Sequence, residues 1–403
     1  MTGKDGQQVK RRRVFYIPGY DPIHPRRYRE LYRKEGAAQA KIAAYDIALK
    51  PKSGGGPYGW HVTGVMDGAR VESDVEVLVW SDIVRGSMDQ GIGATYLQLA
   101  RTAWVYIASG ALFRLMRLRK GPIIAALYPV AMLLGQLALA LALARATGAL
   151  LALTGVPLIG WLGLAVVWPV LAWFRGKDNK LFAYYLMHDY AYSAQFRGAN
   201  PPELEERMAA FRTILCDALS DDVEEVLVVG HSSGAHLAVS ILADMIRAGA
   251  VAAEGPALSF LSLGQVVPMV SFLPEARRLR ADLHFLAARE EITWVDVTAP
   301  GDGCAFALCD PVSVTGVAPE NKRWPLVFSA AFTQTLSPER WRALRWRFFR
   351  LHFQYLCAFD RPGDYDYFRI TAGPMTLGAR YAGRAPSKSR IDMPASPHTS
   401  MAA

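Results

Sequence analysis

Two adjacent stretches without a charged residue constrain this 403-residue chain more than any other feature of its sequence. Residues 121–144 and 146–174 contain no Asp, Glu, Lys or Arg. About 20 apolar residues, each adding about 1.5 Å of helix rise, cross a hydrocarbon layer about 30 Å thick. Both stretches reach that length, so we predict a transmembrane helical hairpin over residues 121–175. The predicted spans are about 122–144 and 149–174, with a turn at 145–148.

Positive charge around the two stretches predicts their orientation. Four basic residues precede the first span and three follow the second, whereas the turn holds only Arg145. Because Lys and Arg are enriched in cytoplasmic loops, both ends of the hairpin should face the cytoplasm. We therefore expect an integral protein of a cytoplasmic (inner) membrane, with the lipid bilayer as a partner. A pair of buried core helices is the alternative, since such helices are equally apolar. The flanking basic residues are Arg114, Arg117, Arg119, Lys120, Arg175, Lys177 and Lys180.

The remaining composition narrows the class of protein. The net charge is +9, but much of the basic charge lies beside the apolar stretches and near the N-terminus. Since no zinc-finger or RNA-recognition pattern accompanies it, we expect no nucleic-acid partner. The four cysteines form no CxxC pairs, which favours reduced thiols. The N-terminal sequence lacks the apolar stretch of a signal peptide, so we expect the globular part to stay in the cytoplasm.

Outside the hairpin, short apolar runs are separated by turn-like or helix-like sequence. This pattern predicts an α/β fold with a mainly parallel sheet flanked by helices. The expected strands cover residues 14–17, 44–50, 60–66, 75–81, 225–230, 258–264, 292–298 and 325–332. The expected parts of the chain are a disordered basic N-terminus (1–13), a first part of the globular domain (14–120) with a membrane-proximal helix at 95–120, the hairpin, a second part (176–382) and a disordered tail (383–403).

One motif carries a candidate nucleophile. Gly230-His231-Ser232-Ser233-Gly234 matches G-x-S-x-G, with an apolar strand before it and a helix with an apolar face after it. A nucleophile elbow requires this strand, tight turn and helix, and its glycines allow the strained turn to pack closely. Here the chain resembles the α/β-hydrolase superfamily. The resemblance implies an α/β-hydrolase-like fold and a serine hydrolase of the esterase, lipase or thioesterase class. A Gly/Ser-rich turn without chemistry is the alternative.

The resemblance also implies an order along the chain, in which the nucleophile precedes an acid and the acid precedes a histidine. Asp302 follows the expected strand at 292–298, and catalytic groups collect at that edge of a parallel sheet. We favour Asp302 as the acid and keep Asp310 as its main rival. His352 is favoured as the base because the other histidine after Asp302 is His398, in the predicted disordered tail.

Backbone donors for a tetrahedral oxyanion are predicted at two places. Ser233, the residue after the nucleophile, would supply one N–H group. The loop after the first expected strand would supply the other, from Gly19 or Tyr20. The family's loop usually begins with a His-Gly pair at this point, whereas this chain has Pro18-Gly19. Possible substrate-site residues are His24 and His231.

These residues predict acyl transfer to Ser232, with His352 as general base and Asp302 orienting it, followed by hydrolysis of the acyl-enzyme. Anchoring beside a bilayer favours a lipid-like ester or thioester as substrate. Since the chain has no phosphate-binding loop, dinucleotide motif or metal-ligand spacing, we expect no cofactor and no metal. Acyl transfer to another acceptor, an inert hydrolase fold acting as a tethered interaction module, and a transporter-like role of the spans remain alternatives. The sequence leaves the oligomeric state open.

Overall fold

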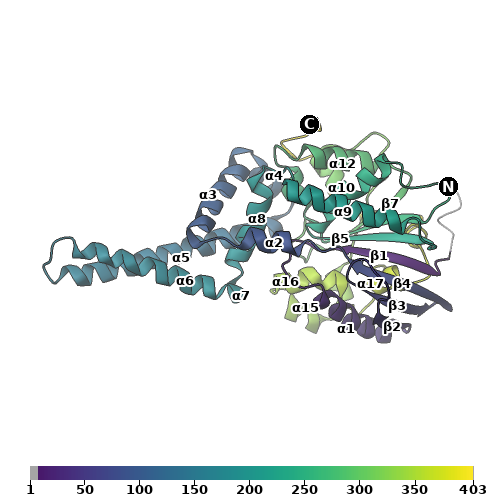
Figure 1. Cartoon of the computed structure of the whole chain (residues 1–403), viewed down its shortest axis with the longest axis horizontal. Coiled ribbons are helices and arrows are strands. Elements are labelled where there is room, and N and C mark those ends of the chain that lie inside the picture. Colours follow the sequence, from purple (N-terminus) through teal and green to yellow (C-terminus); the bar gives the residue numbers. More distant parts are fainter. Residues whose placement is uncertain (1–7, 403) are drawn as a thin grey trace.

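The computed structural model describes residues 8–402 as a globular α/β domain from which a helical hairpin projects (Figure 1). The domain is built on an eight-stranded sheet with the order β2-β3-β4-β1-β5-β6-β7-β8. The six strands β4, β1, β5, β6, β7 and β8 run parallel to one another. At the other end of the sheet, β2 pairs antiparallel with β3, and β3 pairs antiparallel with β4. The predicted mainly parallel sheet is therefore confirmed. The strands are β1 (Arg11–Ile17), β2 (Asp46–Pro51), β3 (Gly59–Met66), β4 (Ala69–Val77), β5 (Glu225–His231), β6 (Ala257–Leu263), β7 (Ile292–Thr298) and β8 (Leu326–Ser329).

Side chains of the central strands point alternately to the two faces of the sheet, and each face has its own hydrophobic core. In β5, Val226 and Val228 belong to one core, whereas Leu227 and Val229 belong to the other. The first core is covered by α9 (Pro202–Ala218), α10 (Gly234–Arg247) and α12 (Arg277–Ala287). The second core is covered by α1 (Arg26–Ala43), α16 (Phe348–His352) and α17 (Tyr367–Ala372). Figure 1 shows these two groups of helices above and below the sheet.

The remaining helices form the hairpin, join it to the domain or pack around the sheet. They are α2 (Ser81–Met88), α3 (Ile92–Ala108), α4 (Ala111–Leu118), α5 (Lys120–Ala152), η1 (Ile159–Val166), α6 (Val167–Gly176), α7 (Asp178–Leu181), α8 (Ala183–Gln195), α11 (Val267–Ser271), α13 (Pro311–Thr315), α14 (Phe332–Thr335), α15 (Pro338–Leu344), η2 (Phe353–Leu356) and α18 (Leu377–Arg380). The predicted helix at 95–120 is divided into α3 and α4 by Gly110, which has a left-handed backbone. Of these two, α3 packs on α8.

The hairpin contains two helices that are long and apolar enough to cross a membrane. Lys120–Ala152 has a mean hydropathy of 2.0 and Ile159–Gly176 one of 1.4. Only 28 % and 11 % of their apolar windows are buried, whereas a core helix is mostly buried. The predicted turn at 145–148 is wrong, because α5 continues through it and the chain turns at 153–158. Residues 145–148 include no proline, whereas Pro157 lacks an N–H group and Gly155 takes a left-handed backbone.

Small residues let the two arms of the hairpin approach closely. A Cβ atom on Gly163 would lie 2.3 Å from the carbonyl oxygen of Ala144, and one on Gly148 would lie 2.4 Å from that of Gly160. Such backbone contact is typical of helix pairs in membranes, where packing replaces the hydrophobic effect as the force that associates helices.

Two predictions of disorder are wrong within the described residues. Arg11–Arg13 belong to β1, where Arg12 is buried and its Nε donates to Glu225 at 2.5 Å. The tail from residue 383 has no long helix or strand but is bonded to the domain, for example by Arg280 Nε to the carbonyl of Ser400 at 2.7 Å. In both segments polar residues form hydrogen bonds within the protein. A polar sequence therefore did not imply a segment exposed to solvent. The rest of the predicted disorder, residues 1–7 and 403, lies outside the described part of the chain.

Candidate active site

Ser232 lies on a strained turn between β5 and α10. Its backbone is left-handed, with φ of +55°, and its N–H donates to the carbonyl of Leu263 at 2.9 Å. Its own carbonyl accepts from the N–H of Ala235 at 3.1 Å. A non-glycine residue in this conformation costs about 1–3 kcal/mol, a strain that proteins tend to keep at functional sites. The turn therefore has the conformation that a nucleophile elbow needs.

Three glycines permit this turn. At each of them, other atoms of the protein occupy the space that a Cβ atom would need. A Cβ on Gly234 would lie 2.1 Å from the carbonyl oxygen of Ile17, and one on Gly230 would lie 2.8 Å from the Cα of Ala235. A Cβ on Gly19 would lie 2.8 Å from the Cβ of Ser232. Gly230 thus lets β5 approach α10, Gly234 lets the start of α10 approach the end of β1, and Gly19 lets the loop after β1 approach the serine.

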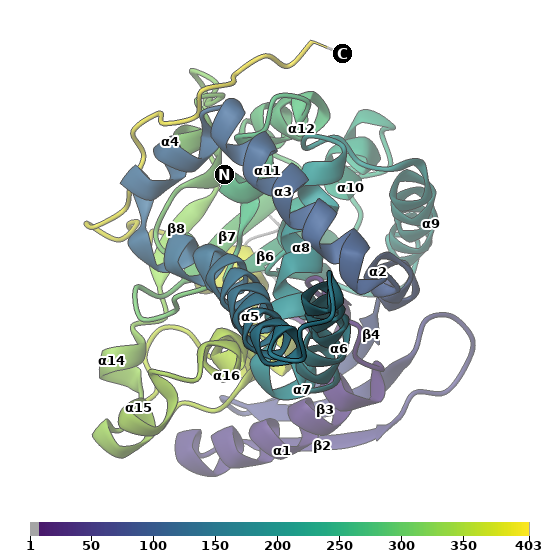
Figure 2. The same cartoon turned by 90° about the vertical axis from the view of Figure 1, so that its left-hand side faces the viewer.

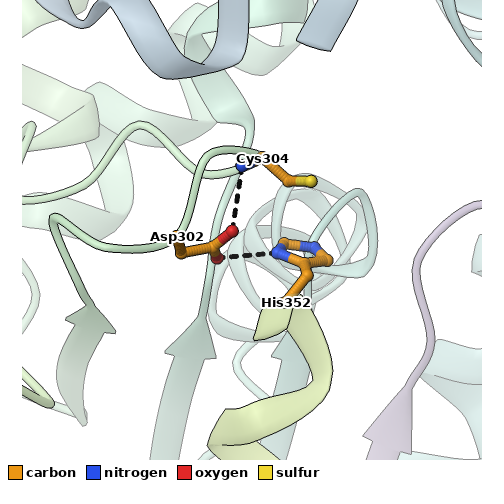
Figure 3. A group of neighbouring side chains, drawn as sticks. All are labelled: Asp302, Cys304 and His352. Atoms are coloured by element: carbon orange, nitrogen blue, oxygen red, sulfur yellow. Dashed lines mark hydrogen bonds and ion pairs between the residues drawn. The ribbon is translucent and has the colours of Figure 1, made fainter. Parts of the chain in front are cut away.

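His352 and Asp302 form a buried pair in which the histidine Nδ1 lies 2.7 Å from the aspartate Oδ2 (Figure 3). Asp302 also accepts from the N–H of Cys304 at 2.9 Å and from the hydroxyl of Tyr355 at 3.0 Å. Burial raises the pKa of Asp302, but the charge of His352 and these hydrogen bonds outweigh it, so the pKa lies below its ordinary value. The carboxylate therefore stays ionised at neutral pH and can orient the imidazole.

The structure brings Asp302, and not Asp310, to His352. Asp310 caps the N-terminus of α13 by accepting from the N–H groups of Val312 and Ser313, each at 3.1 Å. Its second carboxylate oxygen accepts from Lys322 Nζ at 2.6 Å. Asp310 thus has a structural role at the helix start, and its two oxygens are both engaged there.

Ser232 and His352 line one cavity of about 1060 Å³. The Nε2 atom of His352 is buried and has no hydrogen-bond partner within residues 8–402, whereas Nδ1 is held by Asp302. No hydrogen bond joins the serine hydroxyl to Nε2 in this part of the chain, and such contacts are often loose before substrate binds. Nε2 is therefore the nitrogen available to take a proton inside the cavity.

His231 holds the backbone of His352 in place. Its Nδ1 lies 3.1 Å from the hydroxyl of Tyr16, and its Nε2 lies 3.1 Å from the carbonyl oxygen of His352. Burial and the charge of His352 lower the pKa of His231 to about 3, so its imidazole is neutral. In a neutral ring Nε2–H donates to the His352 carbonyl and Nδ1 accepts from Tyr16. Although His231 borders the cavity, both of its ring nitrogens form hydrogen bonds within the protein, one with Tyr16 and one with His352.

The other predicted substrate-site histidine does not reach the cavity. His24 is exposed, and its Nδ1 accepts from the N–H of Arg26 at 3.2 Å. It lies in the loop that leads into α1 and is absent from the cavity lining. The structure therefore does not bring His24 to the cavity of Ser232, since position in the loop after β1 did not fix where its side chain lies.

The predicted oxyanion donors all border the cavity with Ser232. These residues are Gly19, Tyr20 and Ser233. Within the described chain, none of their backbone N–H groups donates a hydrogen bond to the protein. Ser233 also directly precedes α10, whose N-terminus favours negative charge. Free N–H groups beside a serine are of the kind that can stabilise a tetrahedral oxyanion.

Two residues of the site escaped the sequence prediction. Tyr355 donates to Asp302 and accepts from the N–H of Ala299 at 3.0 Å, so it fixes the acid to the end of β7. Asp189 of α8 borders the cavity, and its carboxylate forms no hydrogen bond with the described residues. Burial raises the pKa of Asp189 to about 7, an effect that the charge of His352 partly opposes. Neither residue belongs to a motif, because each is brought to the site by contacts between distant segments.

Asp302, Cys304 and His352 also offer three ligand atoms within 4.8 Å of one another (Figure 3). Burial and the charge of Asp302 hold the pKa of the Cys304 thiol well above its ordinary value, so the thiolate that binds metals is disfavoured. A metal would also have to replace the hydrogen bond between Asp302 and His352. The group therefore fits an acid–base pair better than a metal centre, and the expected lack of a metal stays a prediction.

No protein-family model, curated protein or solved structure matches this chain. The inference of function therefore rests on the geometry and chemistry of this site.

Proposed function

We propose that the chain is a membrane-anchored serine hydrolase of the α/β-hydrolase type that cleaves a lipid-like ester or thioester. The observation that carries the proposal is the strained Ser232, which shares a cavity with the buried pair of His352 and Asp302. An inert scaffold would require neither the strained serine nor unpaired N–H groups beside it. The hairpin would cross an inner membrane with both ends in the cytoplasm, as its basic flanks favour.

The reaction proceeds through an acyl-enzyme. The Ser232 hydroxyl attacks the substrate carbonyl carbon while His352 Nε2 takes the hydroxyl proton. The oxyanion that forms accepts from the backbone N–H groups of Ser233 and of the Gly19–Tyr20 loop. When the tetrahedral intermediate collapses, the C–O or C–S bond breaks and His352 returns the proton to the leaving alcohol or thiol. Water, activated by His352, then attacks the acyl-enzyme and releases a carboxylic acid.

Fluorophosphonate labelling of the membrane fraction tests this proposal. These reagents modify only activated serines, so wild type should be labelled and peptide mapping should place the adduct on Ser232. Ser232→Ala should abolish the label and His352→Ala should reduce it strongly. Ser233→Ala is the matched control, since it removes a neighbouring hydroxyl but keeps the backbone N–H. Absence of labelling in folded wild type, or labelling that persists in Ser232→Ala, would instead support the inert interaction module.

The pH profile should carry a signature of Asp189. The carboxyl group of Asp189 interacts electrostatically with titratable side chains around it. These include Tyr20, Tyr185, Tyr190, Cys304 and His352. Because its pKa is about 7, the group is neutral below that pH and charged above it, and a charge in the cavity opposes binding of an apolar acyl chain. We expect kcat/KM for a neutral ester to fall by about tenfold per pH unit above pH 7. The profile of Asp189→Asn should lack this descending limb, and a limb unchanged in the variant would exclude Asp189 as its source.

A further inference from the structure

The cavity that holds Ser232 reaches the base of the hairpin. Ile124, Ala125 and Tyr128 line it, and these residues lie in the first turns of α5, inside the uncharged stretch. Ile124 is 63 % exposed and Tyr128 is 40 % exposed, so part of this wall faces outward. In Figure 1, α7 and α16 lie beside the base of the hairpin, and in Figure 2, which looks along the hairpin, both lie next to α5. An acyl chain that leaves a bilayer along α5 would thus pass directly into the cavity.

Three exposed basic residues line the same cavity. They are Lys180, Arg347 and Arg350. Within residues 8–402, the side chain of none of them forms an ion pair or a hydrogen bond. Elsewhere the domain pairs many of its arginines, for example Arg12 with Glu225 and Arg207 with Asp82. Unpaired cations at the mouth of an otherwise mainly apolar cavity are suited to an anionic group on the ligand.

Membrane orientation accounts for Lys180 but not for the two arginines. Basic residues orient a span when they lie within about 15–20 residues of its end. Lys180 follows the end of α6 by four residues, whereas Arg347 follows it by 171 residues. The fold, and not the insertion signal, therefore brings Arg347 and Arg350 back to the hairpin base.

The two arginines lie in a segment suited to a membrane surface. Trp346, between Arg345 and Arg347, is 73 % exposed, and Phe348 is 43 % exposed. Exposed aromatic side chains alternating with arginines are typical of protein segments at the level of lipid headgroups. At that level the anionic groups available in a bilayer are the phosphates of its lipids.

We propose that the substrate is an anionic membrane lipid. Its ester-linked acyl chain lies in the cavity along α5. Its headgroup phosphate, which no cationic choline group neutralises, is held by Lys180, Arg347 and Arg350. This inference rests on the proposed hydrolase activity and names its substrate class. The acyl C–O bond breaks and water supplies the hydroxyl, so the products are a fatty acid and an anionic lysolipid.

The test uses the full-length protein in vesicles of phosphatidylglycerol or phosphatidylcholine with identical acyl chains. We expect wild type to release fatty acid from the anionic vesicles at least about tenfold faster, since each basic residue near a surface adds measurable attraction. The double variant Arg347→Gln/Arg350→Gln should reduce this preference to about twofold or less while retaining fluorophosphonate labelling. Arg212→Gln/Arg361→Gln is the matched control, because these arginines lie outside the cavity and form no ion pair with a described residue.

The outcomes separate the substrate from the activity. Equal release from both vesicles by labelled wild type would overturn the anionic lipid and leave the hydrolase intact. A preference that survives in Arg347→Gln/Arg350→Gln, or that the control variant loses equally, would overturn the headgroup site. Faster cleavage of a soluble anionic acyl ester than of either vesicle lipid would overturn entry from the bilayer. Wild type that is neither labelled nor active would count against the proposed function itself.

Discussion

Ser232→Ala should lower the rate of ester hydrolysis by about a millionfold, and adding His352→Ala should lower it hardly further. The serine supplies the attacking oxygen, and the histidine has no proton to take once that oxygen is gone. Effects of residues that act as one unit do not add, since either loss removes the same step. The structure is consistent with this coupling, because Ser232 and His352 border the same cavity. The Nε2 atom of His352 has no hydrogen-bond partner among the described residues.

The measurement is kcat/KM for one ester in wild type, the two single variants and the double variant. The residual rate in all three variants should be similar and should reflect binding and the backbone N–H groups alone. Ser233→Ala should stay within a few-fold of wild type, because only its N–H is used. A double variant about a thousandfold slower than either single variant would show that the two residues act independently, which contradicts the proposed mechanism.

The parts of the fold that the sequence predicts well are those in which local pattern and final environment agree. Strands β5, β6 and β7 are buried on both faces, so they appear as short, mainly apolar runs with recognisable ends. The elbow is likewise local, since Gly230, Ser232 and Gly234 act within a single turn. The two membrane-length helices follow from apolar length alone.

Other features depend on contacts that no local pattern contains. The charged segment Arg11–Arg13 is predicted from its sequence to be exposed to solvent. Arg12 is buried instead, because Glu225 lies beside it on the neighbouring strand. The turn of the hairpin lies at 153–158 because Arg145 is compatible with a helix and the true breaker comes later. Asp189 reaches the site only because α8 lies beside the cavity, and Arg347 only because the chain returns to the hairpin base. Such residues require the tertiary structure.

The choice between two aspartates, which the sequence leaves open, leads to the second large effect. Asp302→Asn should lower kcat/KM by about ten-thousandfold. Because an amide nitrogen at the position of Oδ2 cannot accept from the Tyr355 hydroxyl, the free energy of unfolding should also fall by about 1 kcal/mol. The introduced amide would donate toward His352 Nδ1 and favour the tautomer that carries its proton on Nε2, which cannot accept a proton from Ser232. Asp310→Asn should leave kcat/KM within a few-fold of wild type. It keeps the cap of α13 but weakens the contact with Lys322, so we expect a loss of about 1–2 kcal/mol in the free energy of unfolding.

Kinetics and thermal unfolding of the two variants in detergent separate these roles, because one carboxylate acts on the imidazole and the other on a helix start. Asp302 lies 2.7 Å from His352 Nδ1, whereas both oxygens of Asp310 are engaged by α13 and Lys322. Asp302→Asn should therefore act mainly on kcat/KM, whereas Asp310→Asn should act on the free energy of unfolding and spare kcat/KM. Full activity in Asp302→Asn together with lost activity in a folded Asp310→Asn would reverse the assignment. Loss of activity in both, with both proteins folded, would mean that the loop from β7 to α13 acts as a unit in positioning the base.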